Sequence, residues 1–117
     1  MSKITDEQLA KLRADNPRGV RLFTVAPEDA GDDAGDDFVF RKIDRATYVQ
    51  CRGHQKKALV GQGPADAFSL LAKNLLLFPS ASDFDALRER APAICEEFGE
   101  ELYADADAGL TVREGKR

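Results

Sequence analysis

The sequence has few of the residues from which reactive or metal-binding centres are usually built. Its 117 residues include one histidine, His54, and two cysteines, Cys51 and Cys95. Neither cysteine belongs to a Cys-x-x-Cys motif, and each lies in a stretch with helical apolar periodicity. Both are therefore predicted to be small buried side chains in a reducing compartment. No catalytic residue, cofactor or metal is predicted.

The sequence also lacks a long apolar run and an excess of positive charge. No run approaches the ~20 residues that span a bilayer, and the polar, charged stretch 1–11 does not resemble a signal peptide. The net charge is -4, and the basic residues are scattered along the chain, whereas nucleic-acid binders usually gather them on one face. We expect a protein of the cytoplasm with no membrane or nucleic-acid partner.

The composition is that of an ordinary globular domain, with 43% hydrophobic and 32% charged residues. A chain of this length fits one domain and can bury a core without disulfides or metals. The predicted fold is α+β and mostly helical, a single domain over 1–117. It combines an antiparallel two-stranded hairpin with about five short helices.

The hairpin is predicted from two stretches rich in Val, Leu, Phe and Thr, at 20–26 and 38–43. The connection between them, 28–37, contains six acidic residues and no basic one. Such a segment cannot bury enough apolar surface to order itself. We therefore expect 28–37 to be a mobile acidic loop.

Capping and breaking residues predict the helices. Thr5 and Gln8 match a capping box, Asp44 can cap a second helix, and Pro64 suits the first turn of a third. Ser80 or Ser82 can cap a fourth helix, which ends or kinks at Pro92. The predicted helices cover about 5–15, 45–53 or slightly beyond, 64–78, 80–91 and 93–104, followed by a loose tail over 105–117.

The most apolar segment of the chain is the predicted helix 64–78. Phe68, Leu71 and Leu75 follow the i, i+3, i+7 spacing of one helix face, and further leucines widen this face. A helix that is apolar so far round is either central to the core or shared with a partner, and the sequence leaves both interpretations open. The candidate protein-binding residues are Phe68, Leu71, Leu75, Leu77, Phe78, Phe84 and Leu87.

Other chemical sites have weaker support. Cys51 and His54 could be imagined as a nucleophile and its base, but no third group to orient them is identifiable. The acidic doublets of 28–37 could attract calcium, although the loop has no evident means of holding oxygen ligands together. The segment 105–116 begins like an EF-hand loop but has Leu110 where glycine is required.

Two stretches together resemble the tail assembly chaperones of long-tailed bacteriophages and related prophage particles. The first is 38–48 (FVFRKIDRATY), a strand that leads into a capped helix containing a tyrosine. The second begins with 76–80 (LLFPS) and continues through Phe84, Leu87 and Arg90-Ala91-Pro92 into the last helix. The resemblance covers about 38–102, so the first helix and the acidic insert 29–37 lie outside it.

The resemblance implies a non-enzymatic role in virion morphogenesis. Proteins of this family bind the long, aggregation-prone tape measure protein in the bacterial host cytoplasm. They hold it until tail tube subunits polymerise around it, and then leave. The implied partners are the tape measure protein and the tail tube protein, with self-association open. Apolar helices of such a client could dock by helix-in-groove contact.

Two other functions remain open from the sequence. One is an acidic adaptor or inhibitor module that engages a basic protein partner through 28–37. The other is a small enzyme built on Cys51 and His54. Deleting 28–37 would abolish partner binding by the adaptor, and Cys51→Ser would abolish activity of the enzyme.

Overall fold

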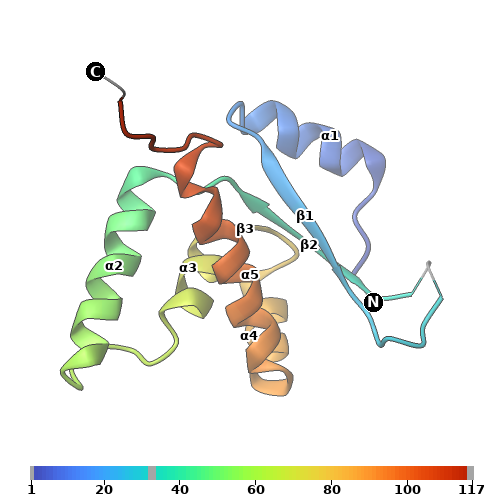
Figure 1. Ribbon diagram of the computed structural model, residues 1–117. Coiled ribbons are helices and arrows are strands. Elements are labelled where there is room, and N and C mark those ends of the chain that lie inside the picture. Colours follow the sequence, from blue (N-terminus) through green and yellow to red (C-terminus); the bar gives the residue numbers. More distant parts are fainter. Residues whose placement is uncertain (1, 32–33, 116–117) are drawn as a thin grey trace.

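The computed structural model describes residues 2–31 and 34–115, and it has the predicted α+β architecture. Helices pack around a small antiparallel sheet (Figure 1). The elements in chain order are α1 (Asp6–Asp15), β1 (Val20–Val25), β2 (Asp36–Arg41), α2 (Arg45–Leu59), α3 (Ala67–Leu75), β3 (Leu76–Phe78), α4 (Ala81–Arg90), α5 (Pro92–Ala104) and the 3₁₀ turn η1 (Asp105–Asp107).

The predicted hairpin is formed by β1 and β2. Their antiparallel register pairs Val20 with Arg41 at one end and Val25 with Asp36 at the other. β2 begins and ends two residues earlier than predicted, at Asp36 and Arg41. Acidic residues that were assigned to the mobile loop therefore belong to the central strand of the sheet.

A third strand, β3, corrects the prediction of a two-stranded sheet. Leu76–Phe78 was expected to end the apolar helix, but this segment pairs with β2, with Phe40 opposite Leu76 and Val39 opposite Phe78. Apolar runs fit a buried strand as well as a buried helix. Residues before a proline favour extended backbone, and Pro79 follows directly. The open edge of β2 supplies the hydrogen-bonding partners.

The helix starts are better predicted than their ends. Thr5 and Gln8 form the predicted capping box of α1, and Ser80 forms another with Asp83 at α4. Asp44 caps α2, which runs six residues beyond its predicted end, to Leu59. α3 is shorter than predicted, because it starts at Ala67 and not at Pro64.

Aromatic side chains from the sheet and the helices form the core. Phe98 of α5 lies between strand residues, with ring centroids 5.1 Å from Phe40 and 5.3 Å from Phe23. Phe84 of α4 meets Phe40 edge-on at 6.5 Å. Cys51 and Cys95 are buried and unbridged, which confirms the prediction of small buried side chains.

α5 lies directly against α3 at Gly99. A Cβ atom built there would collide with the backbone carbonyl and the side chain of Phe68. Only glycine allows this approach, since any side chain would push the two helices apart. The contact aligns α5 over the sheet, where Phe98 reaches the strands.

The first residues of the chain are tied to β2 by polar contacts that we call the N-terminal clasp. The Ser2 amide donates to Asp36 Oδ1 at 2.6 Å, and the Ile4 amide donates to Asp37 Oδ2 at 3.0 Å. Thr24 Oγ1 donates to the other oxygen of Asp37 at 2.8 Å. These contacts correct the prediction that 36–37 belongs to a mobile loop, while Asp32 and Asp33 lie outside the described residues.

Candidate protein-binding surface

The structure divides the seven predicted protein-binding residues into two groups. Leu71 and Leu75 of α3, with Phe84 and Leu87 of α4, are at most 4% exposed and belong to the hydrophobic core. The other three, Phe68, Leu77 and Phe78, are half-buried. The four buried residues therefore belong to the core. For the three half-buried residues a docking role remains a prediction.

The three half-buried residues lie on different elements. Phe68, in α3, packs edge-on against Tyr103 of α5, with ring centroids 5.5 Å apart. Leu77 and Phe78 lie in β3, an edge strand of the sheet. The sequence analysis placed these three residues on one predicted helix, 64–78. In the fold, Phe68 lies on a helix and the other two lie on a strand.

A groove between β1 and α5 is a better-defined candidate for a binding surface. Its volume is about 280 Å³, slightly below the ~300 Å³ at the lower end of small-molecule sites. Such a space suits single side chains of a partner. The groove is lined by Phe23, Thr24, Val25, Ala26, Ile94, Glu97, Phe98 and Glu101.

The apolar floor of this β1–α5 groove comes from strand and helix periodicity together. Phe23 and Val25 are two residues apart, so both point to the sheet face that α5 covers. Ile94 and Phe98 are four residues apart on α5, so they share the helix face turned towards β1. Three of these four side chains, all but Phe98, are half-buried and accessible to a partner.

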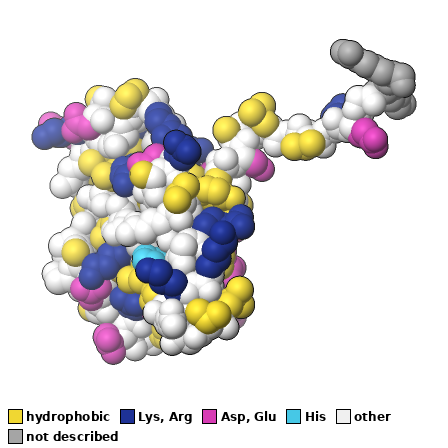
Figure 2. All heavy atoms as spheres, turned by 90° about the vertical axis from the view of Figure 1, so that its left-hand side faces the viewer, with side chains coloured by type: hydrophobic (Ala, Val, Ile, Leu, Met, Phe, Trp, Pro, Cys, Tyr) yellow, Lys and Arg dark blue, Asp and Glu magenta, His cyan; other side chains and the backbone are white. Residues whose placement is uncertain are grey.

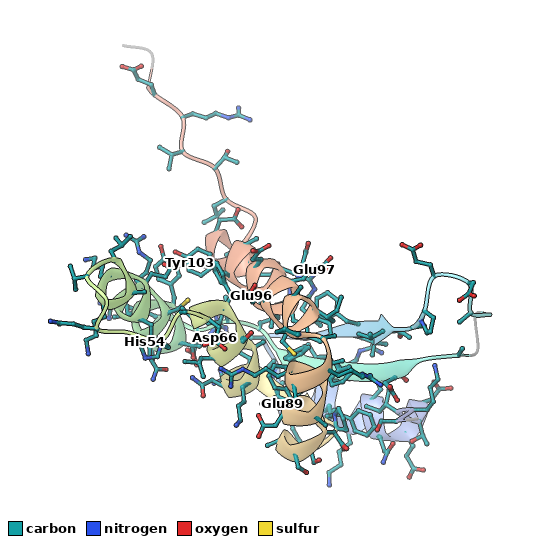
Figure 3. The ribbon with its side chains drawn as sticks, turned by 90° about the horizontal axis from the view of Figure 1, so that it is seen from below. His54, Asp66, Glu89, Glu96, Glu97 and Tyr103 are labelled. Atoms are coloured by element: carbon teal, nitrogen blue, oxygen red, sulfur yellow. The ribbon has the colours of Figure 1, made fainter. Side chains whose placement is uncertain are left out.

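The rim of the groove is acidic. Glu97 and Glu101 follow each other by one helical turn along α5 and are both exposed. Figure 3 shows Glu96 and Glu97 side by side on this helix, and of the two only Glu97 lines the groove. Among the described residues Glu97 has no ion-pair partner, so its charge is available to a ligand.

A basic side chain, Arg21, contacts two of the residues that line the groove, Glu101 and Phe23. Arg21 donates to Asp105 at 2.6 Å and lies 3.6 Å from Glu101. Its guanidinium is also 5.0 Å from the centroid of the Phe23 ring. Glu101 is thus partly neutralised, and the unpaired negative charge of the rim is centred on Glu97.

The geometry around the cysteines does not favour nucleophilic chemistry. Burial raises the pKa of Cys51, and it raises the pKa of Cys95 to about 11. Reactive cysteines need the opposite shift, since the thiolate is the nucleophile. Across 2–31 and 34–115, no group of three or more His, Cys, Asp or Glu side chains is arranged to hold a metal ion.

The basic residues are less scattered than the sequence suggested. α2 contains no acidic residue, and it exposes Arg45, Arg52, Lys56 and Lys57. Figure 2 views the molecule from the side of α2, and Lys and Arg side chains are prominent on this face. The molecule therefore carries a basic helix, α2, apart from the acidic rim on α5.

Sequence reasoning missed the groove because its two walls are far apart in the chain. The individual signals were present: alternating Phe23 and Val25 in β1, and Ile94 with Phe98 one helical turn apart in α5. Nothing in the sequence indicates that these two elements lie side by side. The glutamates of α5 can be seen in the sequence, but the apolar floor beside them cannot.

Comparisons with known proteins assign no family to this chain. No protein-family model, no curated protein and no solved structure matches it. Within the described part of the chain, none of the helices has the length and apolarity needed to cross a membrane.

Proposed function

We propose that this protein is a non-enzymatic tail assembly chaperone that holds an apolar segment of the tape measure protein in the cytoplasm of the bacterial host. The observation that carries the proposal is the β1–α5 groove, whose apolar floor is accessible and whose rim is acidic. A protein that shields an aggregation-prone client must offer apolar surface outside its own core. Phe23, Val25 and Ile94 supply such surface.

The charge of the rim supports the same role. Glu97 and Glu101 stand beside the groove, and the other glutamates of α5 extend the negative charge along the helix. Like charges on neighbouring loaded complexes repel one another and oppose non-specific association. An apolar floor within an acidic rim therefore binds a client segment while keeping the complex dispersed.

Under this proposal, the protein-binding residues predicted from the sequence contribute in two ways. Leu71, Leu75, Phe84 and Leu87 hold α3 and α4 in the core that supports α5. Leu77 and Phe78, at the β3 edge, would add a second contact for a long client.

A pull-down of the tagged protein from cells that also express the neighbouring genes tests the proposal. Mass spectrometry should recover one very long, helix-rich protein. Ile94→Asp should reduce that recovery severalfold, because it places a charge in the apolar floor. Leu110→Asp is the matched control, since Leu110 is 75% exposed and does not line the groove. Circular dichroism verifies that both variants are folded.

Two outcomes would contradict the proposal. Recovery of a short basic protein or a nucleic-acid enzyme, with no long helical client, would favour the acidic adaptor. In that case deleting 28–34, which leaves β2 intact, should release the partner. Equal recovery with Ile94→Asp and Leu110→Asp would mean that the groove is not the client site.

A further inference from the structure

We propose that the outer edge of β1 binds an extended segment of the partner as an additional strand, with apolar side chains entering the β1–α5 groove and a basic side chain meeting Glu97. This inference rests on the proposed function in that it takes the groove as the client site. It goes further by naming the conformation and the residue pattern of what the groove binds.

The sheet offers an open edge at this position. The strand order is β1-β2-β3, so β1 pairs only with β2 in the described sheet. The other edge of a six-residue strand therefore presents backbone donors and acceptors to a partner. Proteins commonly block such edges with proline, bulges or inward-pointing charges. Val20–Val25 contains no proline, and its pairing with β2 is unbroken. Its one charged residue, Arg21, is neutralised by Asp105 and Glu101. An extended chain can satisfy these groups by strand addition.

The dimensions of the groove favour a strand over a helix. A helix with its side chains is ~10–12 Å across, whereas the groove holds about 280 Å³. In a strand only alternate side chains point to one face. A strand beside β1 would place one or two apolar side chains over Phe23 and Val25 while the rest of it stayed outside.

Charge defines the residues next to these apolar positions. Glu97 is exposed at the groove and has no ion-pair partner among the described residues, and Glu101 is only partly neutralised by Arg21. A Lys or Arg of the partner that shares the apolar face would reach this rim. A strand can be added in either direction, so the predicted pattern is basic-x-apolar-x-apolar-x-basic. One of its two basic ends meets Glu97, and the positions marked x face away from α5.

The experiment compares three synthetic peptides with blocked ends, titrated into the full chain and followed by NMR. The first, Lys-Thr-Val-Thr-Val-Thr-Lys, carries the predicted pattern. In the second, glutamate replaces both lysines, and the third is a helix-forming peptide of Leu, Lys and Ala. The first should bind about tenfold more tightly than the second, a difference of ~1.4 kcal/mol. It should also slow hydrogen exchange of amides in Val20–Val25.

Charge reversal on α5 provides matched variants. Glu97→Lys should remove the preference for the lysine peptide, because the rim then repels its basic side chains. Glu100→Lys makes the same change of charge on the same helix, and Glu100 does not line the groove. This control should keep the preference within about twofold, since exposed charges act weakly over distance.

Three results would overturn the inference. They are equal binding of the lysine and glutamate peptides, tighter binding of the helical peptide, and binding that leaves exchange in β1 unchanged. Each of these concerns only the form of the ligand. The proposed function fails separately, if Ile94→Asp leaves recovery of the long client unchanged in the pull-down.

Discussion

Helices α1 and α5 have similar lengths but very different places in the molecule. α5 buries Cys95, Phe98, Gly99 and Leu102, whereas α1 has no buried residue. In Figure 3, α5 lies on one side of the sheet and α1 on the other. α1 nevertheless has the better local signals, because its capping box is complete and α5 has no side-chain cap. A strong start signal therefore says little about how firmly a helix is packed.

The difference extends to what holds each region. The region around α5 is held by apolar burial, with five phenylalanines within ring contact of one another. The region around α1 is tied to the sheet by the N-terminal clasp, in which the carboxylates of Asp36 and Asp37 accept backbone and hydroxyl hydrogen bonds. Few buried apolar contacts mean a low free energy of local opening. We therefore expect the α1 region to detach while the α5 region stays folded.

The largest effect should come from Phe40→Ala, in the apolar region. Phe40 is 0% exposed and contacts three other rings. Its truncation should lower the free energy of unfolding by ~3–5 kcal/mol, measured by urea titration. Leu12→Ala in α1, where the leucine is half-buried, is the control and should cost less than about 1.5 kcal/mol. Similar losses would remove the distinction between the two regions.

An intermediate effect should come from Asp37→Ala, which breaks the clasp. The Ile4 amide and the Thr24 hydroxyl lose their acceptor. Because both hydrogen bonds are only partly buried, their loss should cost ~1–2 kcal/mol. Hydrogen exchange should quicken in α1 and leave α5 protected. Asp6→Ala is the control, because it removes a carboxylate outside the clasp. Hydrogen exchange in α1 should be slower in this variant than in Asp37→Ala. Faster exchange in α5 would show that the clasp supports the whole fold.

The smallest effect should come from Asp44→Ala at the start of α2. Asp44 accepts a hydrogen bond from the Thr47 amide at 2.8 Å. Its hydrogen bonds to Thr47, with a smaller effect of the Arg41 guanidinium, lower its pKa from 3.8 to about 2. Loss of the cap should cost ~1 kcal/mol at neutral pH, measured by thermal or urea unfolding.

The pH dependence of that loss follows from the lowered pKa. The stabilisation by the Asp44 carboxylate is fully present above the unfolded pKa of 3.8, and it is lost as the pH falls through 3.8 towards 2. The difference between wild type and Asp44→Ala should therefore be constant above about pH 5 and shrink in acid. Asp44→Asn keeps a capping oxygen and should retain most of the stability at neutral pH. A difference that grew in acid would contradict this assignment.

Much of the fold could be predicted because its signals are local. The capping residues Thr5, Asp44 and Ser80 act within one turn of the chain, so they located the starts of α1, α2 and α4. The alternating pattern of β1 and its pairing with β2 were likewise readable from neighbouring segments. The buried cysteines were predicted from the apolar residues around them.

The errors occurred where two structures compete for the same residues. The composition of Leu76–Phe78 fits a helix or a strand. The segment forms strand β3 because it can pair with the free edge of β2. The charge of Asp36 and Asp37 is typical of a solvated loop. In the fold their carboxylates accept hydrogen bonds from the Ser2 and Ile4 amides, which stabilises these residues within the sheet. In both cases the deciding partner lies more than thirty residues away in the sequence.

The sequence by itself determined the α+β class, the positions of most helix starts and the apolar residues available for a core, because capping and periodicity act over a few residues. The tertiary structure decided which of those residues are buried. It made core of Leu71, Leu75, Phe84 and Leu87, and it brought β1 beside α5 to form the groove. Such a surface depends on contacts between distant segments, and local patterns carry no information about which segments meet.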